Sequence, residues 1–174
     1  MIVALIGVAA ALDPSHTDRR AWFVVALVLS MAGDVFLMLP RDLFVAGLSS
    51  FLLAHAAYVV GFRMHGGSAL AWAVAGLGVL LVDAVLAAPV LAAVRLRHRD
   101  LLVPVVAYML VISAMTSAAV ATGVALAIAG AALFFASDTL IAWNRFVRPQ
   151  PWMPLAIIVT YHLGQAGLVL SLAR

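Results

Sequence analysis

The stretch AWFVVALVLSMAGDVFLML, residues 21–39, decides the fold. It contains a single charged residue, Asp34, and has nearly the ~20 apolar residues that a helix needs to cross a ~30 Å hydrocarbon core. Lipid offers no hydrogen-bond partner to a free backbone amide, so such a run must be helical. It therefore predicts a membrane-spanning helix that carries a carboxyl group inside the apolar layer.

The remaining chain repeats this pattern. Of 174 residues, 67% are hydrophobic, and the mean hydropathy is +1.19. Met1–Leu12 is too short to span, and it predicts a partial helix or one that begins upstream of Met1. We expect an all-α, polytopic helical membrane protein of about seven helices in a single integral membrane domain, residues 1–174. The other five spans are predicted at Leu43–Met64, Ala69–Val94, Leu101–Thr122, Val124–Val147 and Trp152–Ala173.

The distribution of charge is also typical of a membrane protein, because the ten arginines lie mostly at the ends of these apolar runs. The net charge of +3 therefore does not indicate a nucleic-acid partner; the expected surroundings are a lipid bilayer. With no cysteine, disulfides and thiol catalysis are excluded. Six arginines fall on one side and four on the other, which favours the first side as cytoplasmic, and abundant Ala and Arg point to a bacterial cytoplasmic membrane.

Two helices share a local pattern. Asp34 follows Ala-Gly and Asp138 follows Ala-Ser, and each has an arginine seven residues later, Arg41 and Arg145. The two aspartates lie four helices apart, so both copies have the same orientation and predict a parallel two-helix internal repeat. We expect both carboxyl groups at one depth, facing a single cavity, ~5–10 Å apart as in two-carboxylate hydrolases.

Polar side chains at this depth need an explanation, since a carboxylate inside a bilayer costs ~2.5–3.5 kcal/mol even on the lenient scale. Asp34, Asp138 and the mid-helix His55 are the candidate catalytic residues. On a continuous helix, an arginine seven residues on lies on the same face about 10 Å away, which suits a grip on a lipid phosphate. The alternative is that the arginines extend to the headgroups and the aspartates bond to neighbouring helices.

Other polar residues are candidates for substrate binding. Asn144 alternatively caps a helix end, and Asp83 alternatively pairs with an arginine. Tyr108, with the polar row Ser113, Thr116 and Ser117, could line a cavity or serve helix packing. No metal or other cofactor is expected, because the close ligand spacing of known metal motifs is missing. The full set of substrate-binding candidates is Arg41, Arg145, Asn144, Tyr58, Tyr161, His162, Gln165 and Asp83.

Several of these residues lie in motifs that resemble one known family. Gly-Asp-Val-Phe-Leu-Met at residues 33–38 and Ala-His-Ala-Ala-Tyr at 54–58 look like the lysoplasmalogenase family, the YhhN-like proteins. Phe-Phe-Ala-Ser-Asp-Thr-Leu at 134–140, then Arg145-Phe146 and Thr160-Tyr161-His162 with Gln165, are similar to the C-terminal motif of that family.

The resemblance implies a helical membrane enzyme that cleaves the vinyl ether of a lysophospholipid to a fatty aldehyde and a glycerophospho-base. The resemblance also implies catalytic roles for Asp34, His55 and Asp138. Protonation of the β-carbon would give an oxocarbenium ion that water captures, so one carboxyl group is expected to hold a proton while the other is charged. Two alternatives stay open: a small-solute transporter built from parallel repeats, and a purely structural membrane protein.

Overall fold

The computed structural model describes residues 1–12 and 17–173 of the chain. Its helices confirm the predicted all-α class and follow the predicted spans closely. Six of them are long and apolar enough to cross a membrane, whereas α1 is a short apolar helix. The helices are α1 (Ile2–Ala11), α2 (Thr17–Met38), α3 (Phe44–Arg63), α4 (Ala69–Arg97), α5 (Leu102–Ala121), α6 (Ala125–Ala142) and α7 (Met153–Leu170).

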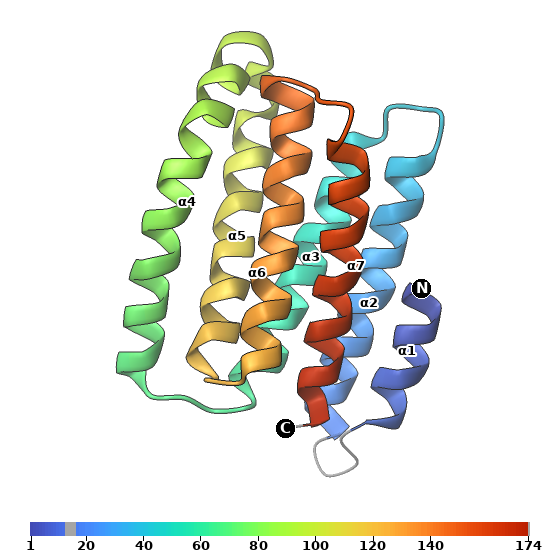
Figure 1. The fold of residues 1–174 in the computed structure, drawn as a ribbon, viewed down its shortest axis with the longest axis vertical. Helices are drawn as coiled ribbons and strands as arrows, with labels where there is room; N and C mark the ends of the chain where they lie inside the picture. The colour runs from blue at the N-terminus through green and yellow to red at the C-terminus, as the bar shows by residue number, and fades with distance from the viewer. Residues whose placement is uncertain (13–16, 174) are drawn as a thin grey trace.

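The long helices form an upright bundle, with α4 at one edge and α1 and α2 at the other (Figure 1). Consecutive helices α2 and α3 pack on each other, as do α6 and α7, and α5 contacts α3, α4 and α6. Helices α2 and α6 run in the same direction, which a parallel repeat requires (Figure 1). The internal repeat itself remains a prediction.

Glycines bring the helices of each pair into close contact. In α6, a Cβ atom at Gly130 would lie 2.6 Å from the backbone nitrogen of Leu168 in α7. In α2, a Cβ at Gly33 would lie 2.6 Å from the Phe51 ring of α3. Since Gly33 precedes Asp34 and Gly130 lies two turns before Asp138, these crossings fix the helices that carry both aspartates.

The ends of these helices correct one prediction. Helix α2 ends at Met38, with Pro40 close behind, so Arg41 lies in the connection and does not share a helical face with Asp34. Arg145 lies in a π-helical turn, Trp143–Val147, closed by a bond from the Arg148 amide to the Trp143 carbonyl. Arg145 and Asp138 therefore do not lie on one continuous α-helix, as the seven-residue spacing assumed.

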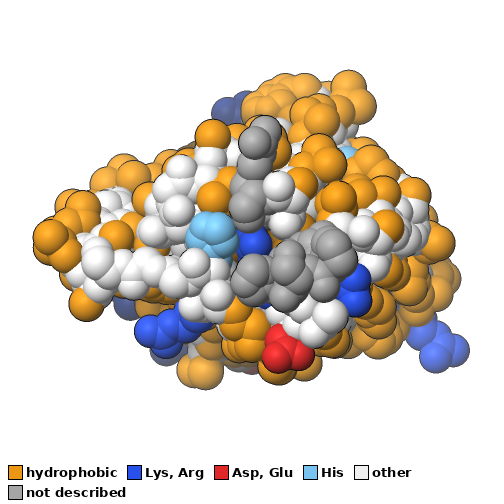
Figure 2. All heavy atoms as spheres, turned by 90° about the horizontal axis from the view of Figure 1, so that it is seen from below, with side chains coloured by type: hydrophobic (Ala, Val, Ile, Leu, Met, Phe, Trp, Pro, Cys, Tyr) orange, Lys and Arg blue, Asp and Glu red, His pale blue; other side chains and the backbone are white. Residues whose placement is uncertain are grey.

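The opposite end of the bundle contains the connection between α3 and α4 (Figure 1). Seen from below, basic side chains lie both at the edge and near the centre of this end, and hydrophobic side chains cover much of the flanks (Figure 2). This arrangement fits the prediction that the arginines mark helix ends and the sides face lipid.

Candidate active site

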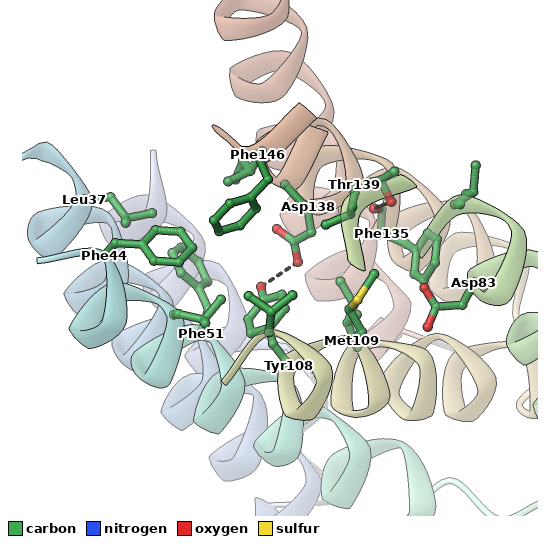
Figure 3. Close-up of a pocket in the computed structure, with 17 residues that line it drawn as sticks. Leu37, Phe44, Phe51, Asp83, Tyr108, Met109, Phe135, Asp138, Thr139 and Phe146 are labelled. Carbon is green, nitrogen blue, oxygen red and sulfur yellow. Dashed lines mark hydrogen bonds between the residues drawn. The ribbon is translucent and has the colours of Figure 1, made fainter. Parts of the chain in front are cut away.

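A cavity lies among α3, α4, α5 and α6, and it contains two carboxyl groups in a mainly apolar lining. Asp138 enters it from α6 and Asp83 from α4. Figure 3 shows Asp138 between the Phe44, Phe51 and Phe146 rings on one side and Asp83 on the other. Phe44 and Phe146 meet edge to face at 5.7 Å, where the cavity approaches the Arg145 end of the bundle.

Asp138 is held by two side chains from other helices. The Tyr108 hydroxyl of α5 donates to Asp138 Oδ2 at 2.6 Å, and His55 Nε2 of α3 lies 3.2 Å from the same oxygen. His55 Nε2 also lies 2.9 Å from the Tyr108 oxygen. Among the described residues, Asp138 Oδ1 has no hydrogen-bond partner, and its side chain is 9% exposed, so this oxygen is free for a ligand in the cavity.

His55 is completely buried, and the network selects its tautomer. Its Nδ1 atom has no hydrogen-bond partner among residues 1–12 and 17–173, and its ring packs edge to face on Phe134 at 4.8 Å. A buried orphaned N–H is rarer than a buried acceptor without a donor. The proton is therefore assigned to Nε2, where it is shared between two acceptors, Asp138 Oδ2 and the Tyr108 oxygen.

Asp34 belongs to a separate polar contact. The Tyr161 hydroxyl of α7 donates to Asp34 Oδ2 at 2.9 Å, and Asp34 is not among the residues that line the cavity. The Tyr161 ring in turn contacts the Phe51 and Phe134 rings at 5.8 and 5.2 Å. The predicted joint lining of one cavity by Asp34 and Asp138 is therefore wrong for this cavity, because aromatic side chains lie between the two networks.

Asp83 is buried and accepts a hydrogen bond from Ser113 of α5 at 2.8 Å. Of the two roles left open for it, completing the polar cavity is the one that this position supports. In the rest of the polar row on α5, Thr116 and Ser117 donate to the Ile112 and Ser113 carbonyls of their own helix, and neither lines this cavity.

Arg41 lies in the connection after α2 and Arg145 in the turn after α6, and both line a second hollow beside Asp42. These two connections lie at the upper end of the bundle in Figure 1. Arg145 donates to Asp42 at 3.0 Å, and its guanidinium lies 3.9 Å from the centre of the Phe44 ring. The hydrogen bond and charge of Arg145 lower the pKa of the exposed Asp42 carboxyl. No local pattern predicts the Arg145–Asp42 pair, because the two residues are 103 positions apart in the chain.

Four other candidates lie outside the cavity lining. Tyr58 and Gln165 are fully buried and bond to each other at 2.5 Å, a contact that joins α3 to α7. His162 Nδ1 bonds the Ile158 carbonyl of its own helix at 2.8 Å. Asn144 Oδ1 accepts the amide of Gln150 at 3.3 Å, a contact within the connection between α6 and α7.

Tyr108 is the residue that the candidate list lacked. Its only sequence signal was its place near the polar row on α5, which predicted a possible cavity position and no partner. Within the described part of the chain, no three His, Cys, Asp or Glu side chains gather in a way that could hold a metal ion.

The whole pattern of helices and polar residues matches a known family over residues 1–172. The chain belongs to the YhhN family. The resemblance found in the Asp34, His55 and Asp138 motifs is thereby confirmed.

Relatives of this YhhN protein include a human protein named lysoplasmalogenase TMEM86B, which is 38% identical over 86% of the chain and 62% of its own length. A Mycobacterium tuberculosis protein named lysoplasmalogenase is 32% identical over 92% of the chain and 63% of its own length. The chain thus spans somewhat less than two thirds of these relatives. No solved structure matches it.

Proposed function

We propose that this YhhN protein is a membrane-embedded hydrolase. Its substrate is a lysoplasmalogen-type lysophospholipid, and its products are a fatty aldehyde and a glycerophospho-base. The observation that carries the proposal is the Asp138 carboxyl group, held by Tyr108 and His55 and facing an apolar cavity with one oxygen free. The names of the human and mycobacterial relatives support the same chemistry.

The reaction needs a proton donor and a negative charge. Protonation of the vinyl ether β-carbon gives an oxocarbenium ion, water adds to the carbon next to oxygen, and the hemiacetal splits into aldehyde and alcohol. Asp138 suits the anionic role, because its Oδ2 atom accepts from Tyr108 and from the proton assigned to His55 Nε2. Its free Oδ1 then stabilises the cation and accepts a proton from the attacking water.

A second carboxyl group supplies the proton in this proposal. Asp34 is assigned this role because its motif resembles that of the lysoplasmalogenase family. It does not line the cavity: its partner Tyr161 contacts Phe51, which does. Phe51 both lines the cavity and contacts Tyr161, the partner of Asp34, so movement of that ring would join the two networks. Asp83 lines the cavity directly and is assigned to substrate binding.

The decisive experiment measures aldehyde release by purified protein in detergent from a panel of lysophospholipids, with mass-spectrometric detection. We expect Asp34→Asn and Asp138→Asn each to reduce turnover at least ~10²-fold, the usual contribution of general acid–base catalysis. Asp100→Asn is the matched control, because Asp100 is exposed in the turn between α4 and α5. Full activity of Asp138→Asn would exclude the proposed chemistry.

The same preparation distinguishes an enzyme from a transporter. Detergent removes the two compartments that transport requires, so turnover in micelles supports catalysis. If wild-type protein releases no aldehyde from any vinyl ether lysolipid, yet moves a solute across proteoliposomes in an Asp34-dependent manner, the protein is a transporter.

A further inference from the structure

A groove runs along the outside of the bundle between α4 and α6, over α5. Small and aliphatic side chains line it, among them Gly78 and Val82 of α4 and Ala132 and Ala136 of α6. Thr116 lies in it too, but its hydroxyl is bonded to the Ile112 carbonyl. The groove therefore presents an almost wholly apolar surface to the hydrocarbon around the helices.

The groove adjoins the carboxylate cavity. Leu86, Phe135 and Thr139 line both. From Leu86 to Gly78 the groove follows α4 for about 12 Å, away from the end of the bundle that carries Arg145. At its other end the cavity shares Leu37 and Phe44 with the hollow beside Arg41 and Arg145. Hollow, cavity and groove thus follow one another in depth.

We propose that the groove between α4 and α6 binds the alkenyl chain of the lysophospholipid substrate. This inference rests on the proposed function and extends it. The phosphate would lie by the arginines of the hollow, the vinyl ether by Asp138, and the chain would pass Phe135 into the groove. An alkyl chain is the occupant of matching chemistry, since the groove is almost wholly apolar, lies on the outer face of the bundle and adjoins the cavity that contains Asp138.

Blocking the groove tests the assignment. Ala132→Phe places a ring in it, and Ala84→Phe is the control, because Ala84 is exposed on the opposite face of α4. With a homologous series of lysolipids, we expect Ala132→Phe to raise KM about tenfold for long chains and little for short ones, with kcat unchanged. Equal effects on all chain lengths, or equal effects of both variants, would overturn the proposal.

A second measurement uses the wild-type protein and does not depend on catalytic activity. Wild-type protein is irradiated with a lysophospholipid that carries a diazirine at the end of its chain, and labelled peptides are sequenced. Labels at residues 78–82 and 132–136, lost on competition with unlabelled lysolipid, support the groove. Labels elsewhere exclude it. If the groove is labelled but the protein releases no aldehyde, the groove binds the lipid chain and the proposed reaction is wrong.

Discussion

Asp138 Oδ2 receives hydrogen bonds from two helices, whereas Oδ1 is left for a ligand. This division of the carboxyl group depends on Tyr108, which has the shorter of the two contacts. The buried His55 ring packs against Phe134, and in this position its Nε2 atom lies 3.2 Å from the same oxygen.

The first residue-scale prediction concerns this hydroxyl. Tyr108→Phe keeps the ring and removes a bond to a charged acceptor, worth roughly 1.5–3 kcal/mol. We expect kcat for aldehyde release to fall about 10- to 100-fold, with KM little changed. Steady-state kinetics on a vinyl ether lysolipid would check this, and combining Tyr108→Phe with His55→Gln should give less than the product of the two losses. Independent effects would show that the two residues do not act on one carboxylate.

A second residue-scale prediction concerns Arg145. Its guanidinium stacks on Phe44 at the mouth of the cavity, and Asp42 neutralises it. Because the pKa of Asp42 is lowered, the pair persists at neutral and mildly acidic pH and is lost only as the pH falls through that lowered pKa. We expect Arg145→Ala to raise KM about tenfold with kcat preserved, and Asp42→Asn to lower KM.

The control for this pair is Arg148→Ala, since Arg148 is exposed at the same end and does not line the hollow. Equal changes in KM for Arg145→Ala and Arg148→Ala would indicate a general charge effect. Arg145 would then have no specific role in binding the substrate phosphate.

At the scale of helices, the α6–α7 crossing is the most exacting contact. A Cβ at Gly130 or Gly164 would meet backbone atoms of the partner helix, which cannot rotate away. We expect Gly130→Ala to lower the melting temperature in detergent by several degrees and to reduce activity by displacing Asp138. Gly76→Ala is the control: nothing lies within 4 Å of its Cβ, and the loss of a helical glycine should be neutral or stabilising. Equal behaviour of the two variants would show that the crossing is loose.

The helices themselves could be predicted closely, because hydropathy reports span length directly: α3 was expected at Leu43–Met64 and occupies Phe44–Arg63. The directions of polar side chains could not. The seven-residue spacing of Asp34 and Arg41 predicts one helical face, but α2 ends at Met38, before Pro40. The contact of Asp138 with Tyr108 depends on how α5 and α6 pack, and nothing local in the sequence reports it.

For the whole molecule, the distribution of arginine predicts its orientation. The end that carries Arg41, Arg145 and Arg148 should face the cytoplasm. Because the chain has no cysteine, single substitutions report this cleanly. We expect Ser68→Cys to react with a membrane-impermeant maleimide in intact cells, and Gln150→Cys to react only after permeabilisation. The reverse pattern would place the hollow lined by Arg41 and Arg145 on the outer side of the membrane.

Helix α4 has 29 residues and is about 43 Å long, whereas a typical hydrocarbon core is only ~30 Å thick. A helix so much longer than its surroundings relieves the mismatch by tilting. Its buried residues face its neighbours along one stripe, Ala75, Asp83, Ala87, Val90 and Val94, while lipid covers the rest. We therefore expect the inclination of α4, and with it the width of the groove beside α6, to change with the thickness of the host bilayer. If the groove binds the substrate chain as proposed, a thicker or thinner membrane would change which chain lengths fit.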